Sequence, residues 1–275
     1  MERTEELRRI STLARQDVVQ MIYEAHAGHV GGSLSIMDIL TALYYGVMNV
    51  DPRNPQWEDR DRLVLSKGHA APALYVTLMN KGYFSREHLG TLRKMGSILQ
   101  GHPDMRKTPG LDFTSGSLGN GLGLGNGMAL AARLSGKDYH TYVILGDGEL
   151  QEGTVWESAM TAGAKKLSNL TAIVDINGLQ VEGAVKDIKD LGDLRGKWES
   201  FGFAVTEVDG HDMEQLYPAL LRTKEPHDRP MAILAHTVKG KGLSFAEGQM
   251  NWHKGDFTPE NYAQAMRELK EALEG

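Results

Sequence analysis

Two oxygen-bearing side chains, Asp147 and Asn177, each follow an apolar run at the point where a buried strand is expected to end. The runs are residues 142–145 and 170–176. If they are neighbouring strands of a parallel sheet, both side chains lie at its carboxyl edge, where open α/β sheets bind ligands. Carboxylate and amide oxygens suit a hard cation such as Mg²⁺ that carries a phosphate. We therefore predict a metal and diphosphate site, with the carbonyl oxygen of Leu179 as a third protein ligand.

The same two positions admit a plainer interpretation, because Asp-Gly and Asn-Gly are common turn sequences. Each dipeptide alone favours a turn, but the two together, each after a buried run, favour the metal site. A dinucleotide site is disfavoured because residues 146–151 lack the third glycine of G-x-G-x-x-G. The glycine-rich stretch 116–127 misses that spacing too, and the sequence contains no G-x-x-x-x-G-K-[ST] motif.

Four histidines lie in glycine-containing or irregular stretches, where a side chain can face a ligand. A lone loop histidine is usually solvated, but four in such contexts favour imidazoles that donate to phosphate or sugar oxygens and move protons. No H-E-x-x-H motif or comparable close pair supports a zinc site. The four are His29, His69, His102 and His253, and we assign no role to the other histidines, His211 and His236 among them.

Lysines and glutamates near these stretches give weaker signals. Lys67 and Lys239 stand at a strand end and in a glycine-rich loop, where they could pair with a phosphate or simply be solvated. Glu152 lies one turn past the Asp147 loop, and a functional and a structural role have equal weight for it. Glu149 and Glu157 begin a helix, where acidic residues are favourable in any case.

Alternating strands and helices are needed to bring these residues together. Apolar spacing of period 3.6 predicts helices, and short apolar runs bounded by glycine or polar residues predict strands. We expect an α/β fold with a doubly wound, mostly parallel sheet flanked by helices, in one domain of residues 1–275. The expected helices are 7–25, 35–44, 70–81, 86–95, 128–132, 154–166, 194–201, 212–221 and one beginning at Pro259; the expected strands are 62–66, 142–145, 170–176, 204–208 and 231–237.

Composition excludes several classes of protein. The 275 residues are 41% hydrophobic and 24% charged with a net charge of −6, which suits a globular protein and argues against a nucleic-acid partner. Cysteine is absent, which excludes disulfides and thiolate metal sites and fits a reducing compartment. The N-terminus is charged, and no apolar run approaches the length of a bilayer span. We therefore expect a cytoplasmic protein without a membrane partner.

The chain resembles the transketolase family at several stretches that occur in order along nearly its whole length. Residues 146–177 look like the thiamine-diphosphate signature, which opens with Gly-Asp-Gly and closes on an asparagine at the spacing seen here. Gly-Asp-Gly alone is a moderate signal, whereas the combination is highly specific. The similar stretches are 28–29, 65–72, 101–103, 116–121, 148–153, 239–242 and 252–253.

The resemblance implies a cofactor and a set of site residues. Thiamine diphosphate would carry Mg²⁺ or Ca²⁺, bound by Asp147, Asn177 and the Leu179 carbonyl. The implied catalytic residues are His69 and His253 at the diphosphate end and the reacting sugar, His29 and His102 at substrate oxygens, and Glu152 in an acidic network that links two active sites. The implied cofactor-binding residues are His69, Gly116, Leu118, Gly146, Asp147, Gly148, Glu149, Asn177, Lys239 and His253.

One departure from the family concerns length. Transketolases are more than twice as long, and the glutamate that activates the cofactor lies in their pyrimidine-binding middle domain, which has no counterpart here. We therefore expect the N-terminal subunit of a split transketolase, with truncation of a longer chain as the alternative. A separate C-terminal subunit would complete each site in an α2β2 heterotetramer. The expected reaction transfers a two-carbon ketol unit from a ketose phosphate to an aldose phosphate, as in the pentose phosphate pathway.

Two rival functions remain open. One is another thiamine-diphosphate enzyme, similar to 1-deoxyxylulose-5-phosphate synthase or a 2-oxoacid dehydrogenase, although residues 66–72 favour transketolase. The other is a non-catalytic binding protein that retains the fold. The presence of Asp147, Asn177 and the four histidines argues against that second rival.

Overall fold

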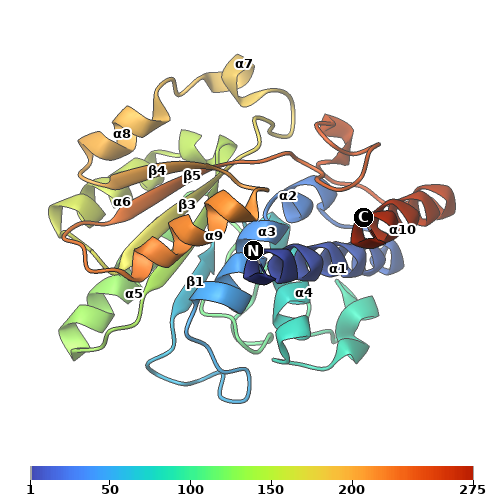
Figure 1. Ribbon diagram of the computed structural model, residues 1–275, viewed down its shortest axis with the longest axis horizontal. Coiled ribbons are helices and arrows are strands. Elements are labelled where there is room, and N and C mark those ends of the chain that lie inside the picture. Colours follow the sequence, from blue (N-terminus) through green and yellow to red (C-terminus); the bar gives the residue numbers. More distant parts are fainter. Residues whose placement is uncertain (1, 275) are drawn as a thin grey trace.

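A five-stranded parallel sheet forms the centre of one half of the molecule in the computed structural model, which describes residues 2–274 (Figure 1). The strand order is β1-β2-β3-β5-β4, and every pairing is parallel. The predicted parallel sheet is therefore confirmed. The strands are β1 (Arg62–Leu65), β2 (Thr141–Gly146), β3 (Leu170–Ile176), β4 (Ala204–Asp209) and β5 (Met231–His236).

Burial explains why the strand sequences differ. All of β2 and the first six residues of β3 are buried, so their sequences are nearly continuous apolar runs. Edge strand β4 is mostly half-buried or exposed and accordingly carries polar residues such as Thr206 and Glu207. A central strand can therefore be recognised from its apolar sequence more easily than an edge strand can.

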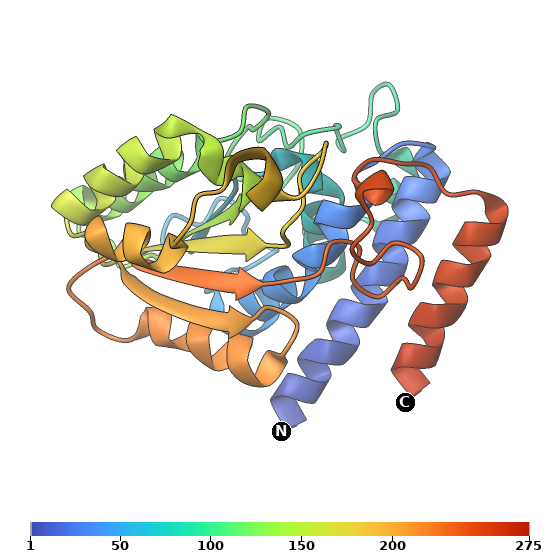
Figure 2. The same cartoon turned by 90° about the horizontal axis from the view of Figure 1, so that it is seen from above.

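Helices cover both faces of the sheet. Helix α5 (Gly121–Ser135) packs on β1, β2 and β3, with α6 (Gly153–Ala164) beside it. Helix α8 (Leu194–Ser200) joins α6 through Trp156 and Trp198, whose ring centroids are 5.4 Å apart. Helix α9 (Met213–Leu221) contacts β4 and lies on the opposite side of the sheet from α5 and α6 (Figure 2).

The remaining long helices form the other half of the molecule. Helix α1 (Glu2–Ala25) and helix α10 (Pro259–Glu274) run side by side in opposite directions (Figure 2). Tyr23 and Tyr262 stack at the end of this pair, with ring centroids 4.1 Å apart. Helix α4 (Ala71–Lys81) also packs against α1, so α1 is covered on more than one side.

The expected helix over 35–44 is wrong in its boundaries. The chain instead forms α2 (Val30–Ser35), α3 (Met37–Ala42) and a π-helical turn, η1 (Leu43–Val47). Ser35 ends α2 and does not cap the next helix. Gly31 and Gly32, which lie outside every helix expected from the sequence, are part of α2 and are buried. Close tertiary packing against α2 has overridden their low helix propensity.

Other helices also differ from expectation. Helix α5 begins at Gly121, so half of the glycine-rich stretch is helical where we expected a loop. The segment 86–95 contains only a short 3₁₀ helix, η3 (Arg86–Thr91). The short helix α7 (Val185–Lys189) was not predicted. None of its residues is buried, so its sequence lacks the pattern of a helix that packs on a core. Residues 96–117 are irregular, as expected.

The structure also bears on membrane association. Within residues 2–274, no helix is both long enough and apolar enough to cross a bilayer.

Gly163 of α6 offers a test of helix packing. A Cβ atom at this position would lie 1.7 Å from the carbonyl oxygen of Phe201. Because that oxygen belongs to the backbone and cannot rotate away, we expect Gly163→Ala to lower the free energy of unfolding by about 2 kcal/mol. Urea denaturation of the purified chain measures the change.

Gly127 of α5 is the matched control. A Cβ atom there meets nothing within 4 Å, so Gly127→Ala should leave stability equal or raise it by up to about 1 kcal/mol through helix propensity. Equal midpoints for Gly163→Ala and the unchanged chain would contradict the described approach of α6 to residue 201.

Candidate functional site

A pocket of about 360 Å³ lies at the carboxyl edge of the sheet. The loops that follow β1, β2, β3 and β5 all contribute to its wall, together with the start of α2 and the 116–118 segment. The structure therefore brings together residues that are far apart in sequence. The predicted residues that line it are His29, His69, Gly116, Leu118, Gly146, Asp147, Gly148, Glu149, Glu152, Asn177, Leu179, Lys239 and His253.

Five further residues line the pocket and were absent from the predicted set. They are Gly32, Lys67, Gln151, Gln180 and Val181. Lys67, at the end of a short strand, was a possible phosphate partner from the sequence but was not assigned to the site. Gln180 and Val181 lie in an irregular segment whose direction no periodicity reveals.

Asp147 follows β2 directly and is buried. Its two carboxylate oxygens accept backbone N–H groups, from Gly148 at 2.8 Å and from Gly178 at 2.6 Å. Burial, with the nearby charge of Asp175, raises the pKa of Asp147 to about 6. A bound divalent cation would favour the ionised form and so relieve this cost.

Asn177 and Leu179 supply two more oxygens beside Asp147. The Asn177 amide nitrogen donates to Asp175 at 2.8 Å, which fixes the orientation of the amide, and its oxygen accepts the Leu179 N–H at 3.2 Å. The Leu179 carbonyl accepts from the Lys239 ammonium at 3.0 Å. One carboxylate, one amide and one carbonyl oxygen therefore border a single pocket, which fits the donor set of Mg²⁺ or Ca²⁺.

The predicted metal ligands are one carboxylate, one amide oxygen and one backbone carbonyl, which is unlike a site built from several carboxylates and imidazoles. Among the described residues, no group of three or more His, Asp or Glu side chains is arranged to hold a metal. The predicted set contains a single carboxylate and does not require such a group. Assignment of Asp147, Asn177 and Leu179 as ligands stays a prediction.

Asp175 is the residue beside the pocket that sequence reasoning missed. It lies within β3, is fully buried, and accepts hydrogen bonds from Lys67 at 2.5 Å, Ser35 at 2.8 Å, Thr237 and Asn177. Burial opposes its ionisation, but the charge and hydrogen bond of Lys67 lower its pKa below the ordinary value. The position of Asp175 within the apolar run 170–176 was the feature of the sequence that could have indicated a buried carboxylate.

Three of the four predicted histidines meet in the pocket. The ring centroids of His29, His69 and His253 are 5.1 to 5.3 Å apart. Burial lowers the pKa of His29 and of His253 to about 4, and that of His69 well below its ordinary value. The three imidazoles are therefore neutral at neutral pH, and each can donate one hydrogen bond and accept another.

Two details bear on how these histidines meet a ligand. The Nδ1 atom of His253 is buried and has no hydrogen-bond partner within residues 2–274, so the ring carries an unsatisfied polar atom. His102 is exposed and stands apart from the three rings. Its charge nevertheless contributes, after burial, to the lowered pKa of His29, so it belongs to the surroundings of the pocket.

Lys239 gives the pocket a buried cation. Burial, followed by the charge of Lys67, lowers the pKa of Lys239 to about 8. Lys67 also lines the pocket, but its charge is paired with Asp175, so Lys239 is the lysine whose charge favours an anionic ligand. A diphosphate has the required charge.

Glu149 and Glu152 occupy different positions despite their similar place in sequence. Glu149 is buried and accepts from the Ser66 hydroxyl and from the N–H groups of Gly119 at 2.8 Å and Gly146 at 3.0 Å. It therefore braces β2 against the loop before α5, and its contact with a cofactor stays a prediction. Glu152 is exposed at the start of α6, on the wall of the pocket.

Residues 6–271 match the family described as "Transketolase, thiamine diphosphate binding domain". The chain belongs to the transketolase family. The predicted resemblance is confirmed, and the match covers all the loops that form the pocket. The family description supports thiamine diphosphate as the cofactor.

Individual relatives fall into two length classes. The chain is 45% identical over 260 residues to one subunit of the apulose-4-phosphate transketolase of Phocaeicola vulgatus, covering 94% of this chain and 92% of that protein. It is 44% identical over 265 residues to the 6-deoxy-6-sulfo-D-fructose transketolase subunit SqwG of a Clostridium species, covering 96% of each. Human transketolase is 40% identical over 250 residues, which are 90% of this chain but 39% of that protein.

Solved structures confirm the predicted fold class. The transketolase of Campylobacter jejuni superposes with a TM-score of 0.91 at 32% identity, covering 96% of this chain and 43% of that one. The transketolase of Leishmania mexicana gives 0.90 at 30% identity, covering 96% and 41%. This transketolase-family chain therefore spans about two fifths of the solved transketolases that it resembles.

The neutral histidines predict a specific pH dependence of stability. His69 has a lowered pKa when folded, so below about pH 6.5 the unfolded chain binds a proton that the folded chain does not. Its contribution to stability therefore falls by roughly 1.4 kcal/mol for each pH unit of acidification below that point. Asp147 has a raised pKa, so its contribution to stability rises as the pH falls. The effect of His69 is therefore measured as the difference in stability loss between the unchanged chain and a His69 variant.

Urea denaturation of the unchanged chain and of His69→Gln at pH 6.5 and pH 5.0 measures this difference. We expect the unchanged chain to lose more stability than His69→Gln over that range. Identical losses would show that His69 is protonated in the folded chain.

Proposed function

We propose that this chain is the diphosphate- and metal-binding subunit of a transketolase, which transfers a two-carbon ketol unit from a ketose phosphate to an aldose phosphate. The observation that carries the proposal is the meeting of Asp147, Asn177, Lys239 and the histidines in one pocket of a transketolase-family chain. A cation site, a cationic side chain and neutral proton carriers are the parts that such a reaction needs from this half of the enzyme.

The diphosphate end of the site would form around the sheet edge. Asp147, Asn177 and the Leu179 carbonyl would hold Mg²⁺ or Ca²⁺ on the diphosphate, and Lys239 would pair with a phosphate oxygen. Thiamine diphosphate, when bound, supplies the carbanion that attacks the ketose carbonyl and the electron sink that permits C2–C3 cleavage. Gly146 and Gly148 leave room at this end for the close approach of the ligand.

His69 and His253 would line the diphosphate end and the reacting sugar, and His29 would contact substrate oxygens. Neutral His29, His69 and His253 can donate to hydroxyl or carbonyl oxygens of the sugar and can accept a proton in return. His102, which is exposed and outside the pocket lining, would contact substrate oxygens. Gly116 and Leu118 would border the ring portion of the cofactor.

A second polypeptide is part of the proposal. Three relatives of matching length are named as subunits, whereas human transketolase extends well beyond the region matched here. We infer that a separate C-terminal subunit carries the pyrimidine-binding domain and completes each site in an α2β2 assembly. Glu152, exposed on the pocket wall, would join the acidic network across that assembly.

The substrates belong to the class of phosphorylated or similarly anionic sugars. One relative is named for apulose-4-phosphate and another for a sulfo-sugar, so subunits of this length are associated with more than one anionic sugar. We place the reaction in the cytoplasm and leave the particular ketose and aldose to substrate profiling, with the sugars of the pentose phosphate pathway as the first to test.

Partner dependence gives the first functional prediction. The purified chain alone, supplied with thiamine diphosphate, Mg²⁺, a ketose phosphate and an aldose phosphate, should show no ketol transfer. Activity should arise when the C-terminal subunit is added. Turnover by this chain alone would contradict the split-enzyme proposal, and turnover of the mixed subunits with pyruvate as donor would favour the 1-deoxyxylulose-5-phosphate synthase alternative.

Asp147→Asn tests the metal site. The change keeps the size of the side chain but removes the charge, so we expect thiamine diphosphate with Mg²⁺ to bind roughly 100-fold more weakly. Titration calorimetry of the assembled subunits measures the affinity.

Asp228→Asn is the control, because Asp228 is exposed and pairs only with its neighbour Arg229 among the contacts described. Its affinity should match that of the unchanged protein. Equal Mg²⁺-dependent binding by Asp147→Asn would exclude Asp147 as a ligand.

A further inference from the structure

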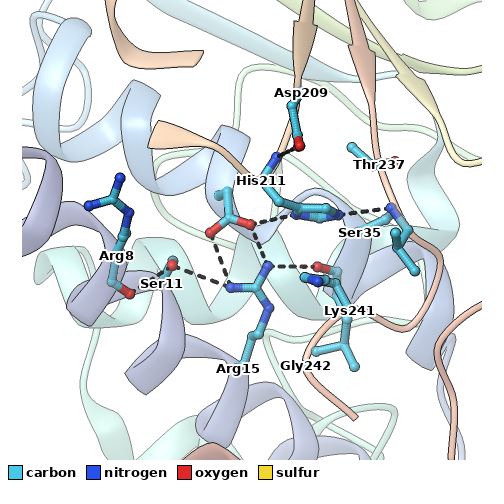
Figure 3. Close-up of polar contacts among 12 residues, drawn as sticks. Arg8, Ser11, Arg15, Ser35, Asp209, His211, Thr237, Lys241 and Gly242 are labelled. Carbon is cyan, nitrogen blue, oxygen red and sulfur yellow. Dashed lines mark hydrogen bonds and ion pairs between the residues drawn. The ribbon is translucent and has the colours of Figure 1, made fainter. Parts of the chain in front are cut away.

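A line of side-chain contacts connects α1 to the loop that carries Lys239, and none of the residues in this line belongs to the lining of the pocket. It runs from Arg15 through Asp38 and His211 to the backbone N–H of Val238. Figure 3 shows Arg15 and His211 turned toward the same carboxylate, which is that of Asp38. Neither composition nor spacing pointed to this line, and we assigned His211 no role from the sequence.

The first link is a buried ion pair. The Arg15 guanidinium donates to both oxygens of Asp38, at 3.1 and 2.6 Å, and also to the Leu34 carbonyl and the Ser11 hydroxyl, each at 3.3 Å. The side chains of Arg15 and Asp38 are 6% and 7% exposed. Burial opposes ionisation of Asp38, but the charge of Arg15 and the hydrogen bonds of His211 and Arg15 lower its pKa. Asp38 is therefore a fixed anion.

The second link determines the tautomer of His211. Its Nε2 atom accepts the Val238 N–H at 2.8 Å, so this nitrogen carries no proton. The proton of the neutral ring must then reside on Nδ1, which lies 2.7 Å from an oxygen of Asp38 and donates to it. Asp38 thus holds the imidazole with its acceptor atom pointing at the backbone of the loop. A second anchor is the His211 N–H, which donates to Asp209 at 2.8 Å.

The third link is the loop itself. Val238 directly precedes Lys239, and the Gly240 N–H donates to the Gly31 carbonyl at 3.1 Å. The stem of Lys239 lies against Gly31, where a Cβ atom would be 2.6 Å from its Cγ atom. Lys239 is therefore held between α2 on one side and the residue anchored by His211 on the other. In this position its ammonium donates to the Leu179 carbonyl at 3.0 Å.

We propose that His211 is a positioning residue that anchors the 238–242 loop, so that the Lys239 ammonium stands where the diphosphate binds. The inference rests on the proposed function for the role of Lys239, but the anchoring itself is independent of any ligand. Arg15 and Asp38 act through His211 by fixing the ring. His211 is not in the lining of the diphosphate pocket and borders a separate pocket of about 440 Å³ between α1 and α10.

A double-mutant cycle distinguishes positioning from a general contribution to the fold. The variants are His211→Asn, Lys239→Gln and the two combined, studied in the assembled subunits. Asparagine keeps a donor for Asp38 but has no atom at the place of Nε2, so it removes the acceptor for Val238 alone. Binding of thiamine diphosphate with Mg²⁺ is measured by calorimetry.

We expect His211→Asn to weaken binding about tenfold, the scale of one lost hydrogen bond, in the presence of Lys239. In the Lys239→Gln background the same change should have no further effect, because the residue to be positioned is gone. Equal effects in both backgrounds would overturn the proposal. His236→Asn is the matched control: it ends β5, its ring contacts Glu207 on the surface, and binding should stay within about twofold of the unchanged protein.

A second measurement needs no ligand. The Gly240 and Gly248 amides donate to the carbonyls of Gly31 and Lys239, so their hydrogen exchange reports whether the loop is anchored. In His211→Asn we expect both to exchange about tenfold faster. Unchanged exchange would overturn the anchoring role even if thiamine diphosphate binds. If the unchanged protein fails to bind thiamine diphosphate while His211→Asn loosens the loop, the proposed function fails and the anchoring stands.

His211→Gln covers the case in which His211→Asn does not fold. The longer amide can place an oxygen near the position of Nε2 and so accept from Val238, while its contact with Asp38 is lost. We expect exchange of the Gly240 and Gly248 amides within about twofold of the unchanged protein. Exchange that rises about tenfold in folded His211→Gln would overturn the proposal that the Val238 acceptor is what anchors the loop.

Discussion

A buried ion pair between Lys67 and Asp175 is the interaction on which the site depends. It joins the segment after β1 to β3 across the intervening β2, and the two side chains are 3% and 0% exposed. Removing one member of such a pair leaves an uncompensated charge, at a cost of about 3–5 kcal/mol. Because Asp175 also accepts from Ser35, Thr237 and Asn177, one carboxylate holds four segments of the pocket wall in register.

The Lys67–Asp175 pair balances its own charges, whereas the charged groups in the rest of the pocket are not balanced by one another. Asp147 has a raised pKa and Lys239 a lowered one. Burial therefore destabilises the charged form of each group by more than the surrounding charges and hydrogen bonds stabilise it. Three imidazoles are kept neutral beside them. Such an arrangement is stabilised by a ligand that brings both a cation and negative oxygens. The electrostatics of the pocket are therefore complementary to a metal diphosphate.

The sequence predicted those parts of the site that depend on local features. Asp147 and Asn177 follow clear apolar runs, so strand recognition and sheet geometry sufficed to place them together. The roles of Asp175 and His211 could not be predicted, because each depends on partners contributed by distant segments. The irregular loops containing the histidines were visible, but which three rings would meet depends on packing that periodicity does not report. Helix boundaries failed where tertiary contacts accommodate glycine, as in α2.

The strand order has a consequence for biosynthesis. Lys67 and Asp175 are 108 residues apart, so their pairing closes a long loop, and such contacts form late in folding. During translation, β1 emerges well before β2 and β3, and the Lys239 loop follows only after β5. A nascent chain consequently lacks part of the pocket wall until residue 253 has left the ribosome. A ligand that needs the whole pocket wall can therefore stabilise the nascent chain only after this residue has emerged.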